Sequence, residues 1–258
     1  MTRAAAAPGG GEVAAAPVAR AAGRLIFALD VDRLAEARRL VHALAGAVGM
    51  FKIGKQLFVA EGPEVVRMVQ RHGGEVFLDL KFHDIPETVG RAAVEAARLG
   101  VRFVDVHASG GATMMARTRE ELRRACRRDG LRRPAVLAVT VLTSLDDADL
   151  RAVGVVGGSA RQVARLAGLA RAAGMDGVVA SPREIAAVRR IGGPRFLVVT
   201  PGVRPPGAAA GDQKRVLGPA EAMGAGASYL VVGRPIRDAP DPRAAAVAIA
   251  AEMTRGRR

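Results

Sequence analysis

The sequence predicts a single-domain α/β protein of the (β/α)8 barrel, or TIM barrel, class. Eight short apolar runs alternate with amphipathic stretches from Leu25 onward. Such runs, rich in Val, Ile, Leu and Phe, are typical of parallel strands that are buried on both faces. Eight strand–helix units in a chain of 258 residues also match the usual size of this barrel, about 250 residues.

Each expected strand is followed by a helical pattern. The strands are predicted at 25–30, 50–54, 75–80, 102–107, 135–140, 176–180, 195–200 and 228–232. The helices are predicted at 34–44, 63–71, 87–99, 114–128, 160–173, 182–190, 219–225 and 242–253. A doubly wound open sheet is the alternative. It commonly carries a glycine fingerprint after its first strand, where this chain has Asp30-Val31-Asp32-Arg33.

Two regions are expected along the chain. Residues 1–24 are predicted to be a disordered Ala/Gly/Pro-rich extension, and residues 25–258 to form the barrel domain, which no Pro/Ser-rich linker divides. A signal peptide fits poorly, because Gly9-Gly10-Gly11-Glu12 and two prolines interrupt any apolar centre. No run of about 18 apolar residues occurs, so we expect no membrane span. The single cysteine, Cys126, excludes an intrachain disulfide and fits a reducing, cytoplasmic location.

The formal net charge of +14 raises the question of nucleic-acid binding. The densest basic stretch runs from Arg117 to Arg133, but it contains no aromatic stacking platform and no recognised reading motif. A solvated helix face is the better interpretation, and we expect no nucleic-acid partner. The positive field would attract small anionic substrates.

Lysine is rare in this chain, which has four lysines against 35 arginines. The remaining lysines are candidates for chemistry that a guanidinium cannot do, because arginine does not release its proton. Lys81 lies between Asp79 and Asp84, as a proton donor held by carboxylates would. A surface ion pair is the alternative reading of the same residues.

Polar residues follow nearly every predicted strand, at the end where barrels carry their active sites. Period-two alternation puts Asp79 and Lys81 on the same side of one strand, and Lys52 lies on the neighbouring strand. We therefore predict an alternating carboxylate–ammonium array at the barrel mouth. Gly233 and Arg234 follow the eighth strand, where barrels often bind phosphate.

Metal binding is the rival chemistry for this site. His83, His107, Asp79 and Asp105 are candidate ligands, but no pair of them has a recognised ligand spacing. Lys52 and Lys81 would also place cations where a metal needs ligands. A site without a metal is expected.

Taken together, these motifs resemble the orotidine 5′-phosphate decarboxylase family. The resemblance runs from Leu25 to about Met253, and its most specific segment is 77–89, which contains Asp79-Leu80-Lys81-Phe82-His83-Asp84. The other matching segments are 27–30, 51–54, 106–111, 142–144, 200–204, 212–213 and 232–234.

The resemblance implies that orotidine 5′-phosphate is the substrate and that it is decarboxylated to UMP without a cofactor, in de novo pyrimidine synthesis. Lys81 would protonate C6 of the pyrimidine as carbon dioxide leaves. Asp79 would flank the substrate carboxylate, and Lys52 would complete the charge network. Asp84 would reach into the neighbouring subunit's site of a homodimer. The implied catalytic residues are Lys81, Asp79, Asp84 and Lys52.

The resemblance also implies how the substrate is bound. Asp30 and Lys52 would contact the ribose hydroxyls, Gln213 would lie on a loop that closes over base and phosphate, and Arg234 with the Gly233 amide would hold the phosphate. The implied binding residues are Asp30, Lys52, Asp79, Ile85, Thr88, Thr143, Pro201, Arg204, Gln213, Gly233 and Arg234.

Two other functions are compatible with parts of the pattern. A related barrel enzyme that acts on a sugar phosphate with magnesium shares the Asp-x-Lys-x-x-Asp signature, but such relatives generally have an acidic residue where this chain has Lys52. A non-catalytic, nucleic-acid-binding barrel would draw only on the net charge, and it would not need the complete set of aspartates and lysines.

Overall fold

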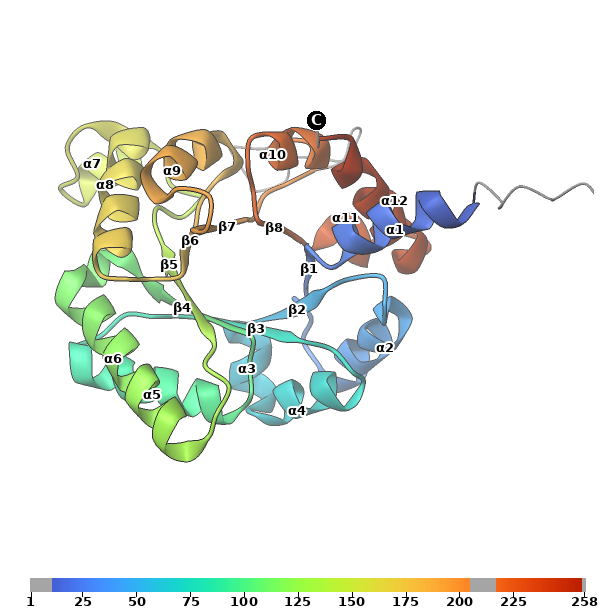
Figure 1. The fold of residues 1–258 in the computed structure, drawn as a ribbon, viewed down its shortest axis with the longest axis horizontal. Coiled ribbons are helices and arrows are strands. Elements are labelled where there is room, and N and C mark those ends of the chain that lie inside the picture. The colour runs from blue at the N-terminus through green and yellow to red at the C-terminus, as the bar shows by residue number, and fades with distance from the viewer. Residues whose placement is uncertain (1–10, 205–216, 257–258) are drawn as a thin grey trace, which may run out of the picture.

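The computed structural model describes residues 11–204 and 217–256. Eight parallel strands close into a barrel, each paired with the next in sequence and the eighth with the first (Figure 1). The strands are β1 (Leu25–Ala28), β2 (Met50–Gly54), β3 (Val76–Phe82), β4 (Phe103–His107), β5 (Ala135–Val139), β6 (Gly177–Val179), β7 (Leu197–Thr200) and β8 (Tyr229–Val232). The predicted barrel class and its eight strands are confirmed.

Helices surround the barrel and cover its outer face (Figure 1). Those that carry the alternating pattern are α2 (Leu34–Leu44), α4 (Glu64–Arg71), α5 (Pro86–Arg98), α6 (Gly111–Asp129), α8 (Gly158–Ala172), α9 (Ile185–Gly192), α10 (Pro219–Gly224) and α12 (Pro242–Arg255). Shorter helices that the sequence did not predict are α3 (Lys55–Glu61), α7 (Asp147–Ala152), α11 (Arg234–Arg237) and the 3₁₀ turn η1 (Ala108–Gly110). A second 3₁₀ turn, η2 (Pro182–Glu184), forms the start of the helix predicted at 182–190.

The barrel interior has an apolar lower part that supports the site. Alternate strand residues point inward and form one buried cluster, which includes Met50, Phe77, Phe103 and Val231. The rings of Phe77 and Phe103 meet edge to face with centroids 6.0 Å apart, and Phe103 meets Tyr229 in the same way at 5.1 Å. These three rings form an aromatic floor beneath the mouth of the barrel. A second, larger cluster fills the space between strands and helices.

The pairing of β3 with β4 is irregular at the site. Leu78 pairs with Val104, and the next pair joins Phe82 to Val106, so β3 advances four residues while β4 advances two. Lys81 lies inside this bulge with φ 52°, the one non-glycine residue with positive φ in the described part of the chain. Bulges of this kind redirect side chains beside active sites.

The N-terminal region differs from the prediction of a disordered extension over 1–24. A helix, α1 (Gly11–Ala22), lies beside α12 (Figure 1), and Ala21 and Ala22 are buried against the core. The cause is composition: alanine has the highest helix propensity of all residues, and the small apolar face of this helix finds a surface to cover. Residues 1–10 lie outside the described part of the chain.

The packing of α1 can be tested with two alanines of the same helix. Ala21→Asp places a charge at a buried position, whereas Ala19→Asp places it on the exposed face. We expect Ala21→Asp to lower the free energy of unfolding by about 1–3 kcal/mol, and Ala19→Asp to change it by less than about 0.5 kcal/mol. Urea denaturation followed by circular dichroism measures both. Equal stability of the two variants would show that α1 does not pack on the barrel.

Candidate active site

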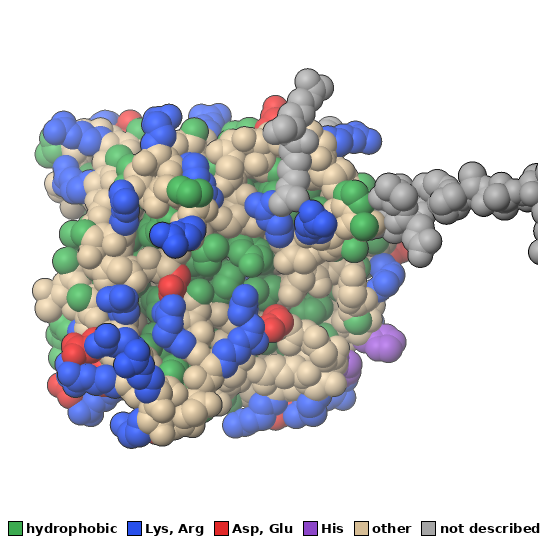
Figure 2. Space-filling model, viewed as in Figure 1, with side chains coloured by type: hydrophobic (Ala, Val, Ile, Leu, Met, Phe, Trp, Pro, Cys, Tyr) green, Lys and Arg blue, Asp and Glu red, His purple; other side chains and the backbone are tan. Residues whose placement is uncertain are grey.

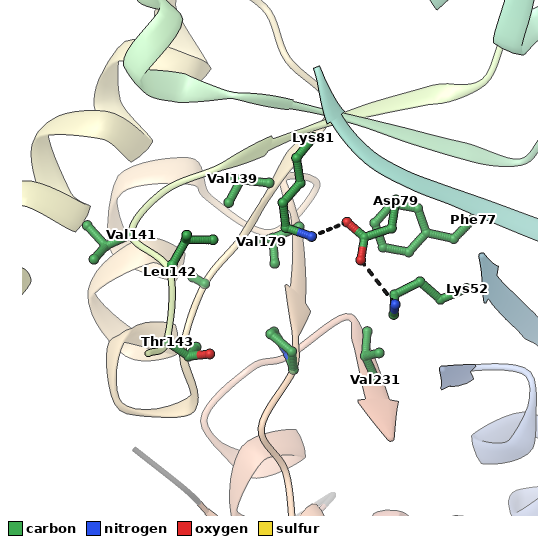
Figure 3. A pocket seen from close by; sticks show the side chains of 12 residues that line it. Lys52, Phe77, Asp79, Lys81, Val139, Val141, Leu142, Thr143, Val179 and Val231 are labelled. Carbon is green, nitrogen blue, oxygen red and sulfur yellow. Dashed lines mark hydrogen bonds and ion pairs between the residues drawn. The ribbon is translucent and has the colours of Figure 1, made fainter. Parts of the chain in front are cut away.

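Four charged side chains form a continuous array across the barrel mouth. Lys52 Nζ lies 3.0 Å from Asp30 Oδ1 and 3.2 Å from Asp79 Oδ2. The other oxygen of Asp79 pairs with Lys81 Nζ (Figure 3). The predicted alternation of carboxylate and ammonium is therefore present, and it brings together Asp30, which follows β1, with residues of β2 and β3.

Strand register explains how Lys52 and Asp79 meet. Lys52 follows the inward-facing Met50 by two residues, and Asp79 follows Phe77 in the same way, so both side chains enter the barrel just above the apolar floor. Their strands are adjacent, with Lys52 opposite Phe77 and Gly54 opposite Asp79. The side chains of Lys52 and Asp79 are 12% and 10% exposed, so this ion pair is largely removed from water.

Lys81 reaches the same carboxylate by a different route from the one the sequence predicted. Simple alternation along β3 put Asp79 and Lys81 on one side of the strand. In the structure the strand is bulged, and the left-handed backbone of Lys81 aims its side chain at Asp79. The backbone N–H of Lys81 donates to Asp105 Oδ1 of β4 at 2.8 Å, which holds this turn in place.

The charges of the array stabilise one another. Burial by itself would raise the pKa of Asp79, but the Lys52 ammonium, a hydrogen bond with Asp105 and the Lys81 ammonium together hold it well below its usual range. Burial opposes the charged form of Lys52, yet Asp79 and Asp30 raise its pKa above the ordinary value. A buried carboxylate and a buried ammonium therefore both remain charged at neutral pH.

An apolar cavity of about 180 Å³ opens beside the ammonium of Lys81 (Figure 3). Thr143 and Pro201, both predicted site residues, line it. Its other apolar walls come from Phe77, Val139, Val141, Leu142, Val179, Ala180 and Val231. A cavity lined mainly by apolar side chains, with Lys81 among its few charged groups, is suited to a small uncharged ring.

A second, more polar hollow adjoins the first and shares Lys52, Pro201 and Val231 with it. Arg204, Arg234 and Arg237 line this hollow together with Gly233 and Asp30. A Cβ on Gly233 would lie 3.3 Å from the Ala28 Cβ, so glycine permits the close approach of β8 to β1 here. Figure 2 shows lysine and arginine side chains around an apolar hollow at the centre of this face. Three guanidinium groups at one end of the site are suited to an anion such as phosphate.

Three predicted site residues are not part of this cavity. Asp84, Ile85 and Thr88 are exposed at the end of β3 and the start of α5, and none of them lines either hollow. Asp84 Oδ1 accepts the backbone N–H of Ile85 at 2.6 Å. The Ile85 side chain is 65% exposed, which is unusual for so large an apolar group. Gln213 lies outside the described residues.

Sequence reasoning missed the roles of two residues. The sequence indicates Asp105 only as a candidate metal ligand, although a carboxylate inside a predicted buried strand already signals a special environment. Arg237 lines the polar hollow and donates through Nη1 to the backbone oxygen of Asp30 at 2.8 Å. The signal for Arg237 was its position one helical turn after Arg234, but the short helix α11 was not predicted.

Across residues 11–204 and 217–256, no three or more His, Cys, Asp or Glu side chains gather into a group that could hold a metal ion. No helix in the same two ranges is both long enough and apolar enough to cross a membrane.

Comparison with known proteins gives a consistent result. Residues 23–249 match the model of the family described as "Orotidine 5'-phosphate decarboxylase / HUMPS family". A protein of Geobacter sulfurreducens named orotidine 5′-phosphate decarboxylase is 58% identical, over 90% of this chain and 97% of its own length. One from Moorella thermoacetica with the same name is 55% identical, over 89% of this chain and 92% of its own length. The crystal structure of orotidine 5′-phosphate decarboxylase from Lactobacillus acidophilus is 38% identical, with a TM-score of 0.79 over 89% of this chain and 98% of that one.

The ring of His107 provides a test of the electrostatics at this end of the barrel. Burial lowers its pKa to about 4, and the nearby His83, Lys81 and Lys55 add to the shift. The native state therefore resists protonation of His107, while the unfolded chain takes up the proton near pH 6.5. The contribution of His107 to the free energy of unfolding is therefore complete above about pH 6.5 and is lost as the pH falls toward about 4.

The free energy of unfolding of the wild type is expected to decline as the pH falls from 6.5 to 4. We expect His107→Asn to make this slope smaller by the contribution of at most one proton, about 1.4 kcal/mol per pH unit. Urea denaturation of the wild type and the variant at several pH values measures this. Parallel curves for the two proteins would mean that His107 does not resist protonation in the folded state.

Proposed function

Because this chain belongs to the orotidine 5′-phosphate decarboxylase / HUMPS family, we propose that it converts orotidine 5′-phosphate to uridine 5′-phosphate and carbon dioxide in pyrimidine nucleotide synthesis. The observation that carries the proposal is the Lys52–Asp79–Lys81 array, which lies between an apolar cavity and a hollow lined by arginines. We propose that the apolar cavity takes the base, that the hollow lined by arginines takes the phosphate, and that the ribose lies between them beside Lys52.

The proposed substrate extends from one hollow to the other. The pyrimidine occupies the apolar cavity beside Lys81, with Thr143 and Pro201 at its walls. The ribose hydroxyls contact Asp30 and Lys52, which line the polar hollow. The phosphate binds Arg234 and the Gly233 amide, and Arg204 lines the same end. Gln213 is proposed to contact the base and the phosphate from the segment that follows.

The proposed chemistry needs a positive charge at one carbon atom. When the bond between C6 and the carboxylate breaks, carbon dioxide leaves and the electron pair remains on C6. The Lys81 ammonium stabilises that pair by its charge and then transfers a proton to it. The product is uridine 5′-phosphate, and the lysine regains a proton from water. No electron sink other than the protein's charges is needed, so we propose that no cofactor takes part.

Asp79 organises the cations in this mechanism. Its two oxygens pair with two different lysines, so it fixes Lys81 toward the cavity and Lys52 toward the ribose. The same pairing argues against the magnesium-dependent sugar-phosphate chemistry of related barrels. A divalent cation at Asp79 would meet two ammonium groups that already occupy both carboxylate oxygens.

We further propose that the enzyme is a homodimer in which Asp84 completes the partner's site. Asp84, Ile85 and Thr88 are exposed and line neither hollow of their own chain, and an exposed isoleucine is suited to an interface. A cytoplasmic location is proposed from the pathway and from the single, buried and unpaired cysteine.

The role of Lys81 can be tested with two substitutions. Lys81→Ala removes the charge and the proton, whereas Lys81→Arg keeps a positive charge that cannot donate a proton. We expect both to lower turnover on the order of 10³-fold or more, with substrate affinity within about tenfold of the wild type. The loss of orotidine 5′-phosphate is followed by its ultraviolet absorbance, with and without a metal chelator, and affinity by calorimetry. Substantial turnover by Lys81→Arg would exclude proton donation by Lys81, and chelator-sensitive turnover would exclude the cofactor-free reaction.

Sharing of Asp84 between subunits can be tested by mixing two inactive variants. Lys81→Ala and Asp84→Asn are each expected to have little activity. If Asp84 acts across the interface, a hybrid dimer has one site in which both residues are intact, and exchange of subunits restores about a quarter of wild-type activity. Recovery of no activity from a mixture that forms hybrids, as checked by native mass spectrometry, would place Asp84 in its own chain's site.

A further inference from the structure

The backbone of Lys81 adopts an unfavourable conformation. Its φ of 52° lies in the left-handed region, which a residue with a long side chain rarely occupies. Such a conformation persists only where neighbouring groups enforce it, and it is common where function requires a particular side-chain direction. The contact that enforces it here is the hydrogen bond from the Lys81 N–H to Asp105 Oδ1, 2.8 Å long.

Asp105 is placed where a carboxyl group is costly. It is 0% exposed and follows Phe103 by two residues on β4, so it lies directly above the aromatic floor. Its second oxygen, Oδ2, receives no hydrogen bond from an N–H or hydroxyl group of the described residues. A buried carboxylate oxygen without a donor is unfavourable, whereas a protonated carboxyl can itself donate.

The groups around Asp105 decide which carboxyl carries a proton. Asp79 and Lys81 face it from β3, Lys52 of β2 lies beyond Asp79, and His107 follows on its own strand. The neighbouring strand β5 (Ala135–Val139) has no titratable side chain. Asp79 is neutralised by two ammonium groups, while Asp105 has one backbone N–H. Burial raises the pKa of Asp105 well above its usual range, and the Asp79 charge adds to the shift.

We propose that Asp105 is a positioning residue that acts as a neutral acid: Oδ1 holds the left-handed turn of Lys81, and the protonated Oδ2 faces the Asp79 carboxylate. Asp105 does not touch the substrate. It acts by aiming the Lys81 ammonium at the cavity and by keeping a second negative charge away from that ammonium. This inference rests on the proposed decarboxylation, because Lys81 is the proton donor in that reaction.

Protonation of Asp105 has a consequence at alkaline pH. Loss of its proton places a new negative charge inside the barrel next to Asp79, and the charge draws the Lys81 ammonium toward the carboxylates. Asp105→Asn keeps an oxygen for the Lys81 N–H and an N–H for Asp79, but it has no proton to lose. Asp105→Leu has a similar volume and provides neither group.

The first test reads the proton directly and does not depend on catalysis. The infrared spectrum of the wild type at neutral pH is expected to contain the carbonyl stretch of a protonated carboxylic acid, and Asp105→Asn is expected to lack that band. Presence of the same band in both proteins, or its absence from the wild type, would overturn the neutral-acid assignment. This result stands even if the wild type fails to consume orotidine 5′-phosphate, which would refute the proposed function instead.

The second test is kinetic. We expect Asp105→Leu to lower kcat by roughly 10- to 100-fold with KM within about threefold, because the buried N–H that orients Lys81 loses its acceptor. Asp105→Asn is expected to recover most of that kcat and to extend activity to higher pH than the wild type. Wild-type kcat in Asp105→Leu, or an unchanged alkaline limb in Asp105→Asn, would overturn the proposal. Should the leucine variant fail to fold, the asparagine variant still decides the question.

Asp176 provides a matched control for general destabilisation. Its Oδ2 accepts the backbone N–H of Val136 at 2.8 Å, so it also holds a strand backbone through a carboxylate, but at the opposite end of the barrel. Asp176→Leu is expected to lower the melting temperature and leave kcat within about twofold of the wild type. An equal fall of kcat in Asp176→Leu and Asp105→Leu would show that loss of stability, and not positioning, explains the effect.

Discussion

The site depends on one buried carboxylate held between two ammonium groups. Asp79 could not remain charged above an aromatic floor without Lys52 and Lys81, and neither lysine would keep its direction without Asp79. Removal of one partner from such a group leaves an uncompensated charge in a poorly solvated place, which is far more costly than the loss of a surface ion pair. The three residues therefore form one structural and chemical unit.

The barrel provides this unit with rigid supports. Adjacent strands fix the separation of Lys52 and Asp79, while the bulge in β3 gives Lys81 an approach that a regular strand would not allow. The arginines of the polar hollow follow β7 and β8. Under the proposed reaction, binding energy from the distant phosphate would help to hold the pyrimidine against Lys81, as remote contacts do in catalysis.

The fold and most of the site could be predicted because both depend on short-range patterns in the sequence. Apolar runs defined the strands, and polar residues at their ends marked Asp30, Lys52, Asp79, Lys81 and Arg234. Two features could not be predicted in this way. The role of Asp105 depends on a backbone turn in another strand. The helix α1 lies in an Ala/Gly/Pro-rich segment whose composition is typical of disordered chains. The exposed position of Asp84, which lines neither hollow of its own chain, likewise depends on the three-dimensional course of the chain after β3.

The aromatic floor has a consequence for how a product leaves the cavity. The rings of Phe77, Phe103 and Tyr229 meet edge to face across the barrel, so within the described residues aromatic side chains close the interior beneath the cavity that Phe77 lines. Under the proposed reaction, carbon dioxide formed above this floor would leave past the bound nucleotide or after the nucleotide has departed. The residence time of the nucleotide would then decide how often the newly released carbon dioxide meets the carbon it has just left.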